Sequence, residues 1–186
     1  MAARASILQS YKEASLAERL DIICKNYTDF LSIIEYFTET LLYMIENEKL
    51  QNRRAKQGEL GVRVQGGRLH GDVTADTAIR HVEIEEAIIS CDFSGDVLED
   101  VDHSKEFQER ANVLKSMRED YDMFNRQLIL LGRKELKVFQ CYLTGEKNLN
   151  DLADAEGISY KSVIQKVRRA KIKIRIQMED VLEGIA

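Results

Sequence analysis

The side chains with the clearest chemical potential lie near the carboxyl end, where cationic and amide groups recur between positions 161 and 171. Amide and guanidinium groups can hydrogen-bond to base edges, and ammonium and guanidinium groups can pair with phosphates. No carboxylate occurs from Gly157 to Met178. Residues 157–186 carry a net charge of +4, whereas the remaining residues carry −9. This segregation predicts a localised anion-binding surface, which the overall net charge of −5 conceals.

Such side chains need a rigid support, and the residues before them have the spacing of a helix-turn-helix. Ala153 is small enough to let two helices cross closely, Gly157 suits a tight turn, and Val163 places an apolar group inside. Asn148 is predicted to cap a helix of two turns, and Ser159 to cap the next helix. The alternative interpretation of this pattern is a generic helical hairpin.

The last predicted helix runs from position 160 to about 182. Four apolar residues at helical spacing should pack inward: Val163, Val167, Ala170 and Ile174. The candidates for contacts in the DNA major groove are Ser159, Tyr160, Lys161, Ser162 and Gln165. The candidates for phosphate contacts are Lys166, Arg168, Arg169 and Lys171. The alternative is a solvated basic face, or a surface for an acidic protein.

The whole chain of 186 residues is predicted to be all-α, because apolar residues recur at spacings of three and four along most of it. We expect an N-terminal long helix or helical hairpin over 1–57, in which the apolar stripe starts at about position 15 with a capping box of Ser15 and Glu18. A Gly-rich connector over 58–72 should follow. A middle helical region over 73–130 and a DNA-binding domain over 131–186 follow. An acidic patch over 96–102 is expected to be a solvated loop, or alternatively to dock on the basic helix and hold DNA off.

Several functional classes find no support in the sequence. No apolar run is long enough to cross a bilayer and no signal peptide is recognisable, so we expect a cytoplasmic protein without a membrane partner. The three cysteines and three histidines lack the spacing of metal ligands. No catalytic motif is recognisable either. We therefore expect no metal, no cofactor and no enzymatic activity.

The C-terminal segment over 131–176 resembles region four of bacterial sigma factors, the helix-turn-helix that binds the promoter −35 element. The matching residues are Lys134, Glu135, Val138, Leu149, Leu152, Ala153, Gly157, Ile158, Ser159 and the run Val163–Ala170. The positions just after Ser159 differ from the arginine-rich set of housekeeping sigma factors. The resemblance therefore implies binding to duplex DNA without implying the target sequence.

The middle of the chain resembles the ArpU/RinA-type phage regulators. The matching residues are Gly61, Val62, Arg63, Val64, Gln65, Asp72, Val73, Thr74, Ala75, Ala78 and Ile79, although Val73 stands where that pattern usually has proline. In those proteins a similar linker joins an N-terminal helical region to a sigma-like C-terminal domain. The resemblance implies activation of prophage late genes together with host RNA polymerase.

The sequence thus predicts a sequence-specific double-stranded DNA-binding transcription regulator, a phage or prophage late-gene activator that works at a promoter. Self-association through the N-terminal helices is a further expectation. One alternative is a DNA-packaging protein similar to a small terminase subunit, which would form ring-like oligomers. Another is a protein-interaction adaptor whose basic helix meets an acidic partner.

Overall fold

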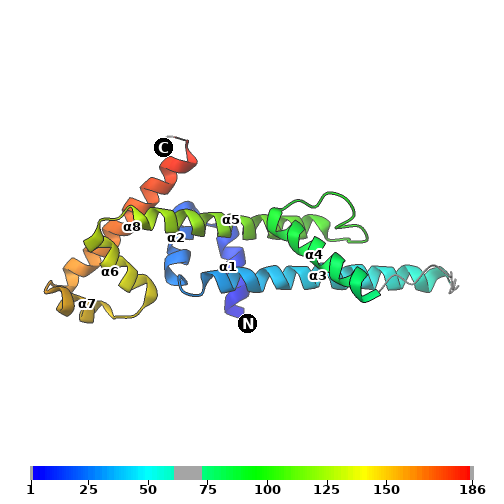
Figure 1. Ribbon diagram of the computed structural model, residues 1–186, viewed down its shortest axis with the longest axis horizontal. Helices are drawn as coiled ribbons and strands as arrows, with labels where there is room; N and C mark the ends of the chain where they lie inside the picture. The colour runs from blue at the N-terminus through cyan, green and yellow to red at the C-terminus, as the bar shows by residue number, and fades with distance from the viewer. Residues whose placement is uncertain (1, 61–72, 185–186) are drawn as a thin grey trace. The chain divides into compact units, whose positions relative to one another are not determined.

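The computed structural model describes residues 2–60 and 73–184, and within these ranges it contains eight helices and no strand (Figure 1). The predicted all-α fold is therefore confirmed. The helices are α1 (Ala2–Glu13), α2 (Leu16–Lys25), α3 (Phe30–Leu60), α4 (Val73–Ser90), α5 (Ser104–Ile129), α6 (Arg133–Thr144), α7 (Leu149–Glu156) and α8 (Tyr160–Leu182). In the part of the chain that is described, no helix is long and apolar enough to span a membrane.

Contacts along the chain define two compact units, which we describe separately. The first contains residues 1–33 and 117–186, and the second contains residues 34–116. The domain boundaries predicted at 57, 72 and 130 follow a different division and stay a prediction. Most of the predicted Gly-rich connector, from 61 to 72, lies outside the described residues, while its first three positions belong to α3.

Local signals explain where several helices begin and end. Ser15 and Glu18 form the predicted capping box at the start of α2, in which the Ser15 side chain accepts from the Glu18 backbone and the Glu18 carboxylate accepts from the Ser15 backbone. Gly145 ends α6 with a φ of 65°, a left-handed conformation that costs glycine little. Within the predicted N-terminal helical region, the sequence does not indicate α1 as a separate helix, because the apolar residues before Ser15 do not form a clear stripe.

An aromatic cluster holds the first unit together. Tyr11 from α1 lies 6.1 Å from Phe30, measured between ring centroids, and Phe30 stacks on Tyr121 of α5 at 5.4 Å. Phe124, also on α5, lies 6.3 Å from Phe139 of α6. Offset and tilted pairs of this kind add to the large apolar area that each ring buries. The rings therefore connect the N-terminal helices of this unit with the helices that precede the predicted DNA-binding motif.

One polar network is enclosed beside these rings. The Tyr11 hydroxyl donates a hydrogen bond of 2.7 Å to Oδ2 of Asp120, a residue that is itself buried. Arg19 Nη1 lies 3.4 Å from the same oxygen, and its guanidinium is 5.5 Å from the centre of the Tyr11 ring. Burial and the Asp120 carboxylate raise the pKa of Tyr11, so its hydroxyl remains a donor.

The second unit packs the outer part of α3 against α4 and the first half of α5. Its core comprises Ile34, Phe37, Leu41, Leu42, Ile45, Ile84, Ala87, Ile88, Phe107, Ala111 and Leu114. The predicted stripes of α3 and α5 provide most of these residues. On the surface, Glu46 of α3 pairs with His81 of α4, with 3.0 Å between Oε1 and Nδ1.

The acidic segment over 96–102 is a loop in which Asp96, Glu99 and Asp102 are exposed, and in this unit it is also tied to α3. Asp100 pairs with Lys56 and, at 3.5 Å, with Arg53. Lys49 donates to two backbone carbonyls of the segment, at Asp96 and Val97. Lys49, Arg53 and Lys56 of α3 lie far from this segment in the sequence, so no local pattern indicates the pairing. Its cationic partners within the unit therefore come from α3.

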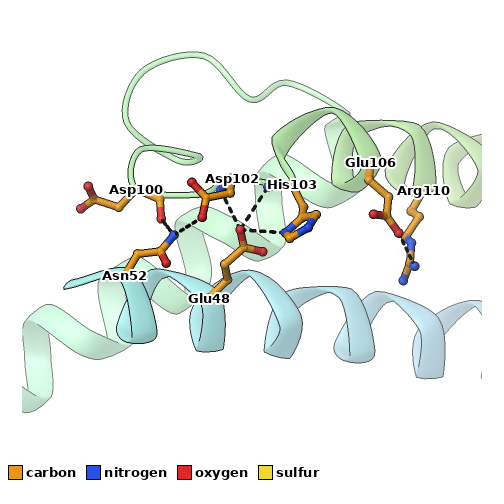
Figure 2. Close-up of polar contacts among 7 residues, drawn as sticks. All are labelled: Glu48, Asn52, Asp100, Asp102, His103, Glu106 and Arg110. Atoms are coloured by element: carbon orange, nitrogen blue, oxygen red, sulfur yellow. Dashed lines mark hydrogen bonds and ion pairs between the residues drawn. The ribbon is translucent and has the colours of Figure 1, made fainter. Parts of the chain in front are cut away.

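Glu48 fastens the end of the same segment at the start of α5 (Figure 2). Its Oε1 accepts hydrogen bonds from the backbone N–H groups of Asp102 and His103 and lies 3.1 Å from His103 Nδ1. Asn52 adds bonds to the Asp100 carbonyl and the Asp102 carboxylate. Burial raises the pKa of Glu48, but the three bonds to Asp102 and His103 together lower it more, so the net shift is downward.

Because the pKa of Glu48 is lower in the folded protein, its contribution to stability is present above the ordinary glutamate pKa and is lost as the pH falls through the folded value. We expect Glu48→Gln to lower the free energy of unfolding by about 1 kcal/mol near neutral pH, because a charge-assisted acceptor becomes neutral. The variant and the wild type should converge in acid. Urea unfolding followed by circular dichroism across the acid range checks this, and an equal difference at every pH would contradict it.

Candidate nucleic-acid interface

The segment from α7 to α8 has the turn that the sequence predicts. Asn148 Oδ1 accepts from the backbone N–H groups of Asn150 and Asp151, both at 2.9 Å, and so caps α7. Gly157 ends α7 with φ 63° and ψ 32°. The N–H of Ile158 then donates to the carbonyl of Ala153 at 3.0 Å, which closes the turn. These bonds leave little freedom in the angle at which the chain enters α8.

Ser159 caps α8 as predicted. Its hydroxyl oxygen accepts from the backbone N–H of Ser162 at 3.3 Å, and the two serine hydroxyls lie 2.9 Å apart. Ser159 thus has a structural role in addition to the groove contact predicted for it. Both serines remain exposed at the amino end of the helix.

The apolar side of α8 is buried as the spacing predicts. Val163, Ala170 and Ile174 are at most 1% exposed, and Val167 is buried as well. Leu152 and Ala153 of α7 are buried in the same unit, in which α8 packs against α6 and α7. Burial of this face fixes the rotation of α8 about its own axis. The opposite face is consequently held toward solvent.

The exposed side of α8 carries most of the predicted contact residues. Tyr160, Lys161, Ser162, Gln165, Arg168 and Arg169 are exposed, and Lys166 is half-buried. No ion pair with a described residue forms at Lys161, Lys166, Arg168 or Arg169. No carboxylate of the described residues is therefore within ion-pair distance of these four groups, so phosphate can serve as their counter-ion.

Lys171 differs from the other predicted phosphate contacts. Its Nζ lies 2.8 Å from Asp21 Oδ1 of α2 and 5.3 Å from the centre of the Tyr142 ring. Burial lowers the pKa of Lys171, but the hydrogen bond to Asp21 and the nearby Cys24 and Tyr142 raise it more. This ammonium already has an anionic partner and a π face, so we leave it out of the phosphate contacts proposed below.

The cations beyond Lys171 are also paired. Lys173 Nζ lies 3.2 Å from Glu135 Oε2 of α6, and Arg175 Nε lies 3.5 Å from Glu179 Oε1 within α8. The cations of α8 thus divide at about position 170. Those of the amino half form no ion pair with a described residue, whereas those of the carboxyl half do. The sequence placed Lys171 among the phosphate contacts, because its partner Asp21 is far away in the sequence on α2.

A further ion pair links the helices that support α8. Lys137 Nζ of α6 lies 2.7 Å from Glu156 Oε1 at the end of α7. Lys137 lowers the pKa of the Glu156 carboxyl through this bond, and Lys166 and Lys134 add smaller effects in the same direction. Sequence reasoning missed this pair, although the lysine is adjacent to Val138, one of the three residues of α6 that carry the sigma-like resemblance.

The cysteines add no recognisable chemistry to this interface. Cys24 is buried, and burial raises the pKa of its thiol to about 12, so it remains a protonated, inert group. Cys91 and Cys141 are half-buried and not oxidised to disulfides. In the described ranges, no three histidine, cysteine or carboxylate side chains gather as metal ligands would. The described arrangement thus offers cationic and hydrogen-bonding groups for an anionic polymer.

Comparison of the chain with protein-family models, with curated proteins and with solved structures gave no match.

Gly157 provides a direct test of the turn. A Cβ at this position would meet no atom within 4 Å, so only its left-handed backbone disfavours other residues. We expect Gly157→Ala to lower the free energy of unfolding by about 1 kcal/mol and Gly157→Val by more. Gly157→Asn should cost less, since asparagine enters this region more readily. Urea unfolding checks the order, and equal losses for alanine and asparagine would contradict it.

Proposed function

We propose that this protein is a sequence-specific double-stranded DNA-binding transcription regulator whose recognition helix is α8. The observation that carries the proposal is the division of α8 into a buried apolar face and an opposite side with three exposed cations and the half-buried Lys166, none of which forms an ion pair with a described residue. A helix held in this way behind a tight turn fits the major groove of B-DNA. The resemblance to sigma factor region four supports the same assignment.

Within this proposal the contact residues have two roles. Tyr160, Lys161, Ser162 and Gln165, with Ser159 at the helix start, face the groove near the amino end of α8, where lysine can contact guanine edges and glutamine adenine edges. Lys166, Arg168 and Arg169 hold phosphates. The positive end of the α8 helix dipole adds to the favourable potential for phosphate. Lys171 instead fixes α8 to α2 through Asp21.

The resemblance to ArpU/RinA-type regulators extends the proposal to activation of phage or prophage late genes together with host RNA polymerase. No separate observation on α8 favours activation over repression, so this step depends on the resemblance. Genomic footprinting combined with in vitro transcription on the footprinted promoter tests it directly. Stimulation of transcription by host polymerase is expected, and footprints confined to a packaging site would favour the terminase-like alternative.

The two roles predict different effects of mutation. Arg168→Ala combined with Arg169→Ala should weaken binding to all duplexes alike. Lys161→Ala and Gln165→Ala should change the preference among sequences. With these three phosphate contacts, log affinity should fall against log salt with a slope of about −3, and the double arginine variant should reduce its magnitude by about two. Fluorescence anisotropy across a salt series, with specific and scrambled duplexes, measures both effects.

The matched control is Lys105→Ala combined with Lys115→Ala, which removes two exposed positive charges from α5. This variant should retain the wild-type slope. Lys171→Ala should also retain it while reducing stability. A shallow slope of log affinity against log salt for the wild type would contradict DNA binding and favour the adaptor alternative. Equal effects of the double arginine variant and the double lysine control would do the same.

A further inference from the structure

The second unit presents a solvent-facing ridge along α3 that its own core does not use. The ridge comprises Glu39, Tyr43, Asn47, Leu50 and Arg54, which recur at spacings of three and four. This spacing places them on one side of the helix, opposite the buried residues Leu41 and Ile45. Tyr43 is 66% exposed and Leu50 is 47% exposed, so the ridge holds two large side chains with apolar surface in contact with solvent.

The ridge is nearly symmetric about Asn47. An apolar residue lies four positions before it and another three positions after it, at Tyr43 and Leu50. A charged residue lies eight positions before it and another seven positions after it, and these two have opposite signs, at Glu39 and Arg54. A two-fold axis beside Asn47 therefore brings Tyr43 of one chain against Leu50 of the other and Glu39 against Arg54. Such self-complementarity is what an isologous dimer interface requires.

The charges of the ridge are available for this pairing. Glu39 and Arg54 are exposed, and neither forms an ion pair with another described residue. The neighbouring cations Arg53 and Lys56 are engaged with Asp100. In a parallel pairing of two α3 helices, Glu39 would face Glu39 of the other copy and Arg54 would face Arg54, so like charges would meet. The antiparallel pairing instead places Glu39 against Arg54 at both ends.

The surface beside the ridge can receive a second helix. A cavity of about 370 Å³ lies on the α4 side, lined by Leu42, Tyr43 and His81 among others. Another of about 410 Å³ lies on the α5 side, lined by Tyr43, Asn47 and Phe107 among others. A helix packs against another by setting its ridges into such grooves. The span from Glu39 to Arg54 corresponds to roughly 22 Å of helix.

A second apolar stripe, on α4, has no comparable symmetry. Ile79, Val82 and Ile89 are exposed, but Glu86 interrupts them. They are followed by acidic residues and not by a pattern of opposite charges that a copy of α4 would match. This stripe therefore serves as a matched control for the ridge.

We propose that this chain forms a dimer in which the α3 ridges of two copies pack antiparallel about a two-fold axis beside Asn47. The proposal does not rest on DNA binding. It specifies the segment within the N-terminal helices through which the expected self-association occurs, and it assigns the partner as a second copy of this chain.

Charge reversal tests the pairing. Glu39→Arg alone and Arg54→Glu alone should each raise the dissociation constant by about tenfold, because two attractive pairs become repulsive. The two substitutions change the net charge in opposite directions, so a general charge effect cannot produce both results. An equimolar mixture of the two single variants should recover the wild-type dimer, since arginine at 39 then faces glutamate at 54. Sedimentation equilibrium over a concentration series measures each case.

The control variants are Glu119→Arg, an exposed charge reversal on α5, and the pair Ile79→Ser with Val82→Ser on α4. Each should leave the dissociation constant unchanged, and circular dichroism should show unchanged helicity for all variants. A monomeric wild type, a ring-like oligomer, a mixture that fails to reassociate, or equal weakening by a control variant would each overturn the proposal.

Discussion

The packing of the apolar face of α8 against the preceding helices determines what this molecule can present to a partner. Val163, Ala170 and Ile174 are inaccessible to solvent or nearly so, and they leave the helix only one rotation about its axis. Burial of the apolar side chains on one face contributes more to folding stability than any exposed ion pair on the other face. A buried aliphatic side chain contributes about 1.5–3 kcal/mol. The exposed face of α8 is therefore a consequence of its core. The turn at Gly157 and the two caps on either side of it set the direction of the helix within that constraint.

The electrostatics of α8 follow from which cations find partners within the folded unit. Those in the carboxyl half meet carboxylates on α2, α6 and α8 itself, and the ammonium of Lys171 also lies over the Tyr142 ring. The cations in the amino half form no ion pair with a described residue. The net positive charge of the C-terminal segment is thereby concentrated near the turn, where a groove-binding helix needs it. In the second unit, too, only some cations find a partner. Asp100 pairs with Arg53 and Lys56, whereas Arg54 stays exposed on the α3 ridge.

Local patterns were sufficient to predict much of this architecture. The all-α fold, the capping box at Ser15, the caps at Asn148 and Ser159, and the buried stripe of α8 were expected, since each depends on residues a few positions apart. The partners of the acidic segment and of Lys171 were not, because Asp21 lies 150 positions from Lys171 and nothing local marks the contact. The helix α1 was missed because Tyr11, the one buried residue among positions 7–13, anchors it through contacts with distant residues. The groove and phosphate roles of the α8 side chains stay predictions.

The central claim is that the exposed amino half of α8 enters a DNA groove, and site-specific photo-crosslinking tests it most directly. A photoreactive residue at position 165 should form crosslinks to bases of a bound duplex, whereas the same residue at position 115 on α5 should form few. High salt should abolish the crosslinks at 165, since cationic contacts to phosphates hold the complex together. Equal yields at the two positions, or no base crosslinks from 165 in a duplex that the protein demonstrably binds, would contradict the account.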